Sequence, residues 1–248
     1  MTVDLNCDLG EGAGLDAELM PLITSANIAC GAHAGDAATM RDTVALAQRY
    51  GVAIGAHPGF ADHEHFGRRE LSILPREAGE LVLTQVQQLE KITRESGAIV
   101  TYVKLHGALY NMASRDRALA EGIVGALWCR ERRPMLFALA GSVLEQVARK
   151  RDEKRVRAEV FADRTYQSDG SLTPRAMPGA LITDEDLAVA QVLRMVRKGL
   201  VRATDGSEVA IRAETICLHG DGPRAVALAR RLRTELAAVG IGVKAFHP

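Results

Sequence analysis

The chain has 248 residues, the size of one large or two small domains, and 47% of them are hydrophobic and 25% charged, as in ordinary globular proteins. Its 31 acidic residues balance 31 basic ones, so no basic excess points to nucleic acid or an anionic membrane as the partner. The N-terminus lacks the features of a signal peptide, no apolar run is long enough to span a membrane, and the four scattered cysteines form no C-x-x-C pair, which together predict a soluble cytoplasmic protein with reduced thiols.

Short apolar stretches alternate along the chain with longer segments of helical periodicity. The predicted strands are residues 3–8, 26–31, 52–57, 99–106, 134–140, 156–161 and 215–220. The predicted helices are residues 36–50, 75–96, 114–131, 183–199 and 223–239, opened by Asp36, Pro75, Ser114, Thr183 and Pro223. Repeated strand–helix units indicate parallel strands with crossover helices, in either an open doubly wound sheet or a closed barrel.

Several features favour a seven-stranded β/α barrel, formed as one domain by residues 1–248. No G-x-G-x-x-G follows the first strand and no G-x-x-x-x-G-K-[ST] occurs anywhere, so the nucleotide-binding open sheets lose their best signature. Polar residues gather at the predicted carboxyl ends of the strands, where a barrel builds its active site. Three connections, 58–74, 161–182 and 201–214, are long enough to carry function, and Asp205-Gly206 in the last predicts a surface hairpin.

The first strand carries three polar residues in alternation, Asp4, Asn6 and Asp8, and Glu11 follows in a glycine-rich turn. Alternation places the first three on one face, toward the axis of a barrel. Inward polar groups are costly unless they are paired or functional, so we favour a functional role over ordinary loop carboxylates.

The tripeptide Gly-Ala-His occurs twice, at His33 and His57, each time after a predicted strand. Neighbouring strands could direct both histidines, together with Asp8, to one cavity. Two histidines and a carboxylate suit Zn²⁺ or another divalent ion with a position open for water. A single histidine in this setting would more simply be hydrogen-bonded in a crowded turn, and the spacing alone does not decide between the two.

The fourth strand ends in VKLHG, in which Lys104 and His106 face the same side. A lysine within a buried strand is rarely there for packing. Lys104 could stabilise an oxyanion or a phosphate, with His106 as acid or base, or it could pair with Asp4 or Asp8.

Further polar residues follow the later strands and the long connections. They are Glu159, Asp163, Arg164, Arg175, His219 and Asp221, together with the doublet Arg68 and Arg69. Asp221 precedes a predicted helix N-terminus, which offers free N–H groups to an anion. The arginines could hold a carboxylate or a phosphate at the mouth of the barrel.

The motifs DLNCDLGEG, ANIACGAHAGD, GAHPGF, VKLHGALYN, EVFADRTY and CLHGDGP, in this order, resemble the LamB/YcsF family from residue 3 to about residue 246. The resemblance implies a seven-stranded β/α barrel akin to the sugar deacetylases. It also implies opening of the small molecule 5-oxo-L-proline to L-glutamate, with ATP hydrolysed to ADP and phosphate, by a 5-oxoprolinase that has separate B and C subunits.

With that reaction, we expect Asp8, Glu11 or His57 to activate water, with or without a metal held by Asp8, His33 and His57. Lys104 and His106 would stabilise the oxyanion or phosphate, and Arg68 or Arg69 would hold the substrate carboxylate. The remaining residues expected to bind substrate are Asn6, Asp163, Arg164, His219 and Asp221. Without a phosphate-binding loop, ATP is bound in an unfamiliar way or by the partner subunits, and we expect little turnover by this chain alone.

Two alternatives of other kinds stay open, as does a homo-oligomer. One is a metal-dependent deacetylase or carbohydrate hydrolase on the same barrel, with Asp8, His33 and His57 as ligands. The other is a carbohydrate-binding or regulatory barrel, which would need stacking aromatic residues in a chain that has only 4% of them.

Overall fold

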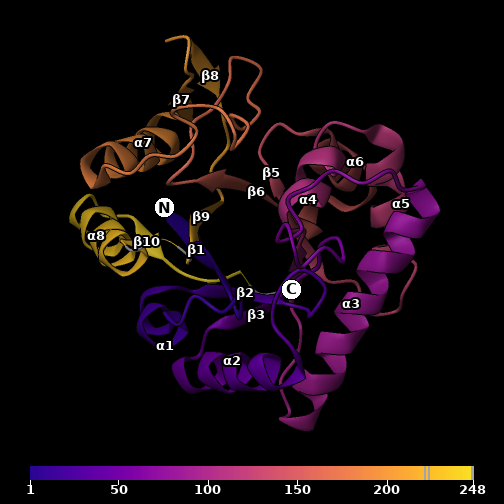
Figure 1. Ribbon diagram of the computed structural model, residues 1–248. Coiled ribbons are helices and arrows are strands. Elements are labelled where there is room, and N and C mark those ends of the chain that lie inside the picture. Colours follow the sequence, from indigo (N-terminus) through magenta and orange to yellow (C-terminus); the bar gives the residue numbers. More distant parts are fainter. Residues whose placement is uncertain (221, 223, 247–248) are drawn as a thin grey trace.

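Seven parallel strands close into a barrel with helices around it (Figure 1), as the sequence predicts. In the computed structural model, which describes residues 1–220, 222 and 224–246, each strand pairs with the next and the last pairs with the first. The barrel strands are β1 (Thr2–Leu9), β2 (Ser25–Ala29), β3 (Ala53–His57), β4 (Tyr102–Lys104), β5 (Met135–Leu139), β6 (Val156–Phe161) and β9 (Thr215–His219). A short strand, β10 (Gly242–Val243), pairs with the start of β1.

Helices cover the outside of the barrel. They are α1 (Asp16–Leu19), α2 (Ala37–Tyr50), α3 (Pro75–Glu95), α4 (Gly107–Ala113), α5 (Arg117–Trp128), α6 (Val143–Asp152), α7 (Glu185–Lys198) and α8 (Ala225–Ala238). The expected hairpin after α7 is confirmed, with β7 (Leu200–Arg202) antiparallel to β8 (Glu208–Ala210). Within the described chain, no helix combines the length and the apolar character needed to cross a bilayer.

Several element boundaries differ from the prediction. The expected helix 114–131 is shorter and corresponds to α5 alone, because the Asp116 side chain accepts a hydrogen bond from Leu119 N at the start of that helix. Asp184, rather than Thr183, caps α7. Pro223, the expected start of α8, lies outside the described residues.

Three helices and part of a strand also depart from expectation. The helix α1 is a single turn, α4 lies where the sequence predicts a connection, and the many charged residues of α6 mask a narrow apolar stripe. Of the expected strand 99–106, β4 keeps three residues.

The barrel interior is polar at β1. Asp4, Asn6 and Asp8 point inward and are at most 5% exposed, while Leu5 and Cys7 belong to the apolar layer beneath the helices. Hydrogen bonds compensate this burial: Asp4 accepts from the hydroxyls of the β2 region and of β9, and Asn6 donates to Thr215. Strand alternation therefore brings a hydrogen-bonded polar network to the barrel axis.

Aromatic side chains fill the end of the barrel at which strands β4 and β5 begin. The rings of Tyr102 and Phe137 stack with centroids 4.0 Å apart, and Met135 completes the cluster. Gly55 makes room for them, because a Cβ there would lie 2.2 Å from the Tyr102 ring. The Tyr102 hydroxyl donates to Asn27 and so joins this plug to the polar network above it.

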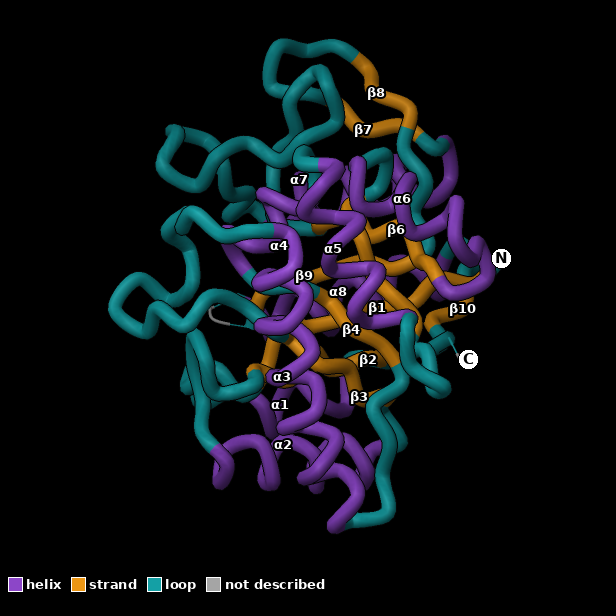
Figure 2. Tube along the Cα trace, turned by 90° about the vertical axis from the view of Figure 1, so that its right-hand side faces the viewer, coloured by secondary structure: helices purple, strands orange, loops and turns teal. Residues whose placement is uncertain are grey.

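Long loops gather at the other end of the barrel, opposite the two chain termini (Figure 2). They follow the carboxyl ends of the strands, where β/α barrels carry their active sites. The predicted site residues at the strand ends therefore lie among these loops.

Candidate active site at the carboxyl end of the barrel

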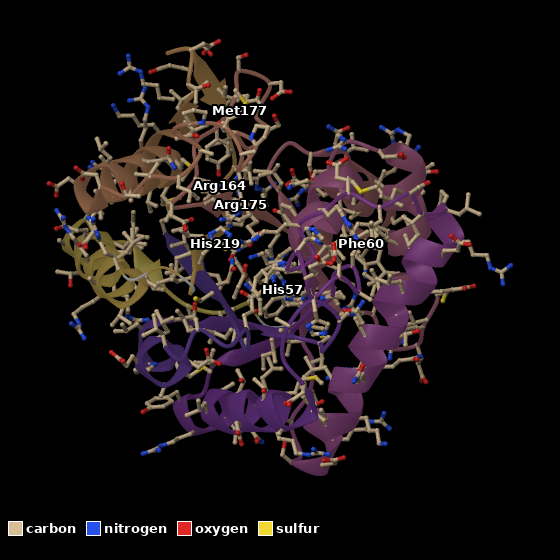
Figure 3. The ribbon with its side chains drawn as sticks, in the orientation of Figure 1. His57, Phe60, Arg164, Arg175, Met177 and His219 are labelled. Atoms are coloured by element: carbon tan, nitrogen blue, oxygen red, sulfur yellow. The ribbon has the colours of Figure 1, made fainter. Side chains whose placement is uncertain are left out.

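A cavity of about 410 Å³ opens among these loops. Its surroundings include His57, Arg164, Arg175 and His219, which come from separate segments of the chain (Figure 3). The lining side chains are Asp8, His57, Lys104 and His106, with Arg68, Glu70, Tyr110, Asn111, Phe161, Arg164, Arg175 and His219. Most of the residues predicted to act on substrate thus share one space.

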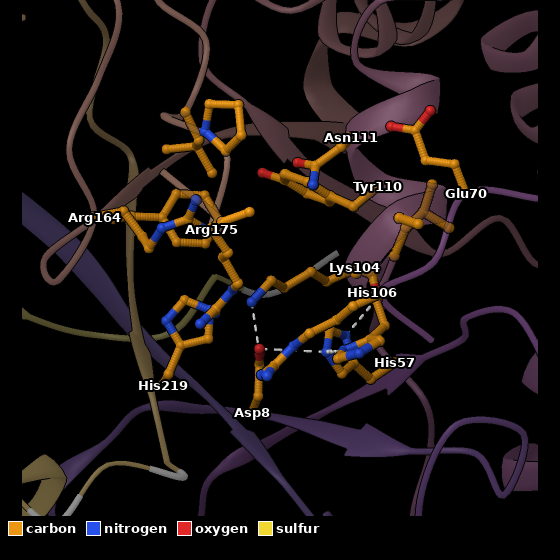
Figure 4. A pocket seen from close by; sticks show the side chains of 18 residues that line it. Asp8, His57, Glu70, Lys104, His106, Tyr110, Asn111, Arg164, Arg175 and His219 are labelled. Carbon is orange, nitrogen blue, oxygen red and sulfur yellow. Dashed lines mark hydrogen bonds and ion pairs between the residues drawn. The ribbon is translucent and has the colours of Figure 1, made fainter. Parts of the chain in front are cut away.

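Lys104 lies at the floor of the cavity and is 2% exposed. Its Nζ is 2.6 Å from Asp8 Oδ1 (Figure 4). It is also 3.3 Å from Glu159 Oε1 and donates to Cys217 Sγ at 3.0 Å. Burial by itself would lower the pKa of Lys104, but Asp8 and the other neighbours outweigh burial and hold it well above its ordinary value. Lys104 is a buried ammonium ion, paired with Asp8 and Glu159 rather than with Asp4.

Asp8 is the anionic partner. Burial would raise its pKa, yet His57 and Lys104 hold it well below the usual range of a carboxyl group. Asn27 donates to Asp8 Oδ1 at 2.7 Å, the oxygen that also binds Lys104. The other oxygen, Oδ2, lies 3.3 Å from His57 Nε2.

Four side chains, Glu11, His33, His57 and His106, form what we call the histidine–glutamate cluster. One ligand atom of each lies within 4.8 Å of the others. The rings of His33 and His106 stack at 3.7 Å, and the His33 and His57 centroids are 5.5 Å apart. The expected convergence of His33 and His57 near Asp8 is confirmed.

Burial keeps the His33 and His106 rings neutral. Burial and the neighbouring His57 lower the pKa of His33 to about 3, and the same two causes lower the pKa of His106 well below its ordinary value. The sequence groups Asp8 with His33 and His57 as metal ligands. The structure places Glu11 and His106 with those histidines instead, and Asp8 belongs to a second group with Cys217 and His219.

The loop after β3 holds the cluster from above. Phe66 has a φ of 53°, the one positive value among the described non-glycine residues, and its carbonyl accepts from His106 Nε2 at 2.8 Å. At the next residue, Gly67, a Cβ would lie 2.9 Å from the His33 side chain. This unusual backbone is held in place by close packing, as is common at functional sites.

Arginines form part of the cavity wall. Arg164 is buried and donates to the carbonyls of Thr173 and Ala180, so it organises the 161–182 loop. Burial and Arg175 lower its pKa to about 10, which leaves it charged at neutral pH. Arg68 lines the cavity with its guanidinium 4.8 Å from the Phe66 ring centroid.

Asp163 and His219 form an ion pair at 2.8 Å. Burial would raise the pKa of Asp163, but His219 outweighs burial and lowers it. His219 lines the cavity and Asp163 does not, and their pairing is not predicted from the sequence.

Among the described residues, three that are predicted to bind substrate do not line the cavity: Asn6, Arg69 and Asp163. Asn6 is wholly buried below the cavity, where it bonds to Thr215 and Asn27. Arg69 pairs with Asp62 in the 58–74 loop and does not line the cavity. Asp221 lies outside the described residues.

Sequence pattern alone does not single out Tyr110 and Asn111, which line the cavity from α4. Tyr110 donates to Glu159 at 2.6 Å and so orients the second carboxylate beside Lys104. Their signal is hidden because α4 begins directly after His106, where the sequence predicts a connection.

Comparison with known proteins agrees with this architecture. The model of the LamB/YcsF family matches residues 3–248. A protein of Shouchella clausii, named as the A subunit of 5-oxoprolinase, is 52% identical, with 98% of each chain covered. The crystal structure of a lactam utilization protein from Thermus thermophilus has a TM-score of 0.90 at 45% identity, covering 99% of this chain and 100% of that one.

A more distant neighbour shares the fold alone. It is a family 4 carbohydrate esterase from Streptomyces lividans, with a TM-score of 0.52 at 11% identity over 98% of this chain and 91% of that one. The expected kinship with deacetylase barrels is confirmed at the level of the fold.

Proposed function

Because this chain belongs to the LamB/YcsF family, we propose that it opens the lactam ring of 5-oxo-L-proline to L-glutamate as the A subunit of an ATP-dependent 5-oxoprolinase. The observation that carries the proposal is the buried Lys104–Asp8 pair on the floor of a cavity whose wall contains arginines. It supplies a fixed cation and a fixed anion beside one small space, which ring opening needs.

We assign Lys104 the role of stabilising the negative charge that develops on the lactam oxygen. When water adds to the ring carbon, the carbonyl oxygen gains charge, and a pre-oriented ammonium in a cavity shielded from water stabilises it more than bulk water would. If ATP first phosphorylates that oxygen, the same ammonium faces the phosphate. Either way the ammonium does not need to move, because Asp8 and Glu159 already hold it.

We assign Asp8 the role of activating the attacking water. Of the three groups predicted to activate water, Asp8 is a carboxylate on the cavity floor whose Oδ2 is not used by Lys104 or Asn27. Glu11 does not line the cavity, and the ring of His57 is committed to the histidine–glutamate cluster. The ring nitrogen takes up a proton as the C–N bond breaks.

Arg68 is assigned to the substrate carboxylate. A guanidinium matches a carboxylate with two parallel hydrogen bonds, and Arg68 lines the cavity while its neighbour Arg69 is drawn to Asp62. The 5-oxo-L-proline anion would therefore lie with its carboxylate at the wall and its lactam carbonyl toward Lys104.

The use of ATP and the assembly with B and C subunits are part of the proposal. The sequence has no phosphate-binding loop of the G-x-x-x-x-G-K-[ST] type. We therefore assign the activation of the lactam by ATP to the assembled enzyme, and we expect little turnover by this chain alone.

Reconstitution tests the proposal. The chain is combined with the B and C subunits, and ADP and glutamate are measured with and without 5-oxo-L-proline. We expect ADP formation that requires 5-oxo-L-proline and all three chains. An assembled complex with no such ATP hydrolysis would overturn the proposed function, and full activity of the single chain would overturn the division of roles.

The adjacent arginines provide a matched pair for the same assay. Arg68→Ala removes a charge-assisted hydrogen-bonding pair of about 1.5–3 kcal/mol, so the KM for 5-oxo-L-proline should rise about tenfold or more. Arg69→Ala removes the same charge from the neighbouring position and should leave the KM within about twofold. Equal effects of the two substitutions would remove Arg68 from the substrate site.

A further inference from the structure

Two ring nitrogens in the histidine–glutamate cluster lie next to each other, and with neutral rings neither carries a hydrogen that it could donate to the other. His57 Nδ1 is 2.8 Å from the carbonyl of Lys104, and His106 Nε2 is 2.8 Å from the carbonyl of Phe66. A carbonyl oxygen can only accept, so both of these nitrogens carry hydrogen. In a neutral imidazole the other nitrogen is then bare, which leaves His57 Nε2 and His106 Nδ1 as acceptors.

These two bare nitrogens lie 3.0 Å apart. Other acceptors surround them: His57 Nε2 is 3.3 Å from Asp8 Oδ2, and Glu11 Oε1 is 3.7 Å from His57 Nε2 and 3.4 Å from His106 Nδ1. Lone pairs at these distances repel one another in a buried space. The arrangement therefore calls for a positive charge between them.

The spacing of the four ligand atoms identifies that charge. A tetrahedral ion with ligands at about 2.0–2.1 Å separates those ligands by about 3.4 Å. The cluster shows 3.0, 3.1, 3.4 and 3.7 Å for the pairs His57–His106, His33–Glu11, His106–Glu11 and His57–Glu11. These four pairs straddle the tetrahedral value, and all the ligand atoms lie within 4.8 Å of one another. Because the His33 and His106 rings stack in parallel, one of them must turn for both to point at one ion.

We propose that Glu11, His33, His57 and His106 bind one divalent transition-metal ion, with Zn²⁺ as the best match. Three imidazoles and a carboxylate are the ligand types that Zn²⁺ takes, and the four-fold set fits its tetrahedral preference. The carbonyls of Lys104 and Phe66 accept from the opposite ring nitrogens and so orient the ligating histidines. This site differs from the predicted Asp8–His33–His57 set and does not depend on the proposed reaction.

The alternative to a metal ion is a proton on His57 Nε2, which would also supply a positive charge. One N–H points in one direction, so it can serve Asp8 or His106 but not both. The contact of His106 Nδ1 with Glu11 would stay between two acceptors in either case. A single metal ion places a positive charge among all of these acceptors.

The surrounding backbone holds the rings ready. A Cβ at Gly59 would lie 3.1 Å from the His106 side chain and 3.2 Å from His33 Nδ1, so the loop packs tightly against both rings. His33 Nδ1 is buried and has no hydrogen-bond partner among the described residues. His33 is thus held through Nε2, the nitrogen that faces Glu11. Preorganisation of this kind favours a rigid metal site.

Metal content of the full chain, measured without substrate, tests the proposal. The chain is stripped with a chelator and titrated with Zn²⁺ and with Co²⁺, whose visible absorption is intense in tetrahedral sites and weak in octahedral ones. We expect one ion per chain, a tetrahedral Co²⁺ spectrum and a higher Tm for the loaded chain. No stoichiometric binding at micromolar metal, or an octahedral spectrum, would overturn it.

Substitutions then locate the ion. Glu11→Gln and His106→Gln should each weaken Zn²⁺ binding by at least about tenfold, the lower range for altered metal sites. His219→Gln is the matched control, since His219 borders the same cavity but belongs to the second group with Asp8 and Cys217. Loss of metal with His219→Gln, and retention in the other two, would assign the ion to that second group. Because the titrations use no substrate, a failure here leaves the reconstitution result untouched. Should a variant not fold, the Co²⁺ spectrum of the natural chain still decides whether a tetrahedral site exists.

Discussion

Lys104 keeps its charge inside the barrel because two carboxylates share it. With Asp8 at 2.6 Å and Glu159 at 3.3 Å, the ammonium is both a structural link and the cation proposed to face substrate. Removing one partner of a buried pair costs about 3–5 kcal/mol, because the other charge stays buried and unpaired. Stability and activity must therefore be separated when Lys104 is replaced.

Lys104→Met keeps the length of the side chain and removes its charge. We expect a folded but less stable chain whose activity in the assembled enzyme falls at least about a hundredfold, as when one oxyanion donor is removed. Urea unfolding and the ADP assay measure the two effects.

The double variant Lys104→Met/Asp8→Asn supplies the control. It removes both charges, so it should regain part of the lost stability without regaining activity. Near-normal activity in folded Lys104→Met would make Lys104 purely structural.

Residue patterns predict which side chains face inward but not which of them meet. Alternation in β1 and around β4 places Asp8 and Lys104 at the axis, and this is confirmed. Their pairing, in preference to Asp4, depends on the relative heights of strands that are not neighbours. The grouping of Glu11 with His106 depends on a loop whose positive φ at Phe66 has no signature in sequence.

At the scale of elements, α3 and α5 approach closely because glycine lies between them. A Cβ at Gly122 of α5 would lie 2.2 Å from the carbonyl oxygen of Pro75, at the start of α3. Backbone cannot move aside as a flexible side chain can. At Gly125, one turn further along α5, the nearest atom to such a Cβ is the end of the Arg151 side chain at 3.5 Å.

These two glycines make a matched pair. Gly122→Ala should destabilise the fold by about 1–3 kcal/mol through overpacking. Gly125→Ala should stabilise it by up to about 1 kcal/mol, because alanine is the better helix former. Urea unfolding of the two variants checks this. Equal shifts would show that α3 and α5 can separate without cost.

Helix existence can be predicted from sequence more easily than helix boundaries. The sequence predicts a helix that opens at Ser114, whereas Ser114 follows the end of α4 and α5 begins after Asp116. The hydrogen bond from Leu119 N to the Asp116 side chain marks where α5 begins. For α2, where Asp36 caps and Gly51 terminates, local chemistry and structure agree at both ends.

At the scale of the whole molecule, the two ends of the barrel differ in chemical character. The aromatic plug around Tyr102 closes one end, and the charged cavity occupies the other. Between them lies a column of buried ionisable groups, so the stability of the molecule should depend on pH. Asp4 and Asp8 act in opposite directions: burial raises the pKa of Asp4, while His57 and Lys104 overcome burial and lower the pKa of Asp8.

The sign for Asp8 follows from linkage. Its pKa in the folded chain lies below the value of about 3.9 for an unfolded aspartate, so its contribution is fully present above that value. The contribution is lost as the pH falls through the lower, folded pKa. Lys104, whose pKa is raised, contributes fully at all pH values below about 10.4 and does not change in this acid range.

Comparing the Asp8→Asn variant with the natural chain isolates the contribution of Asp8 to the pH dependence of stability, because Asp4 is present in both. At pH 7 the variant should be about 3–5 kcal/mol less stable than the natural chain, because Lys104 loses its nearest partner. The difference should shrink as the pH is lowered below about 4, since Asp8 of the unfolded natural chain then binds a proton more readily than Asp8 of the folded chain. Urea unfolding of both chains from about pH 7 down to about pH 2.5 measures the two curves. A difference that stays constant over this range would show that folding does not lower the pKa of Asp8.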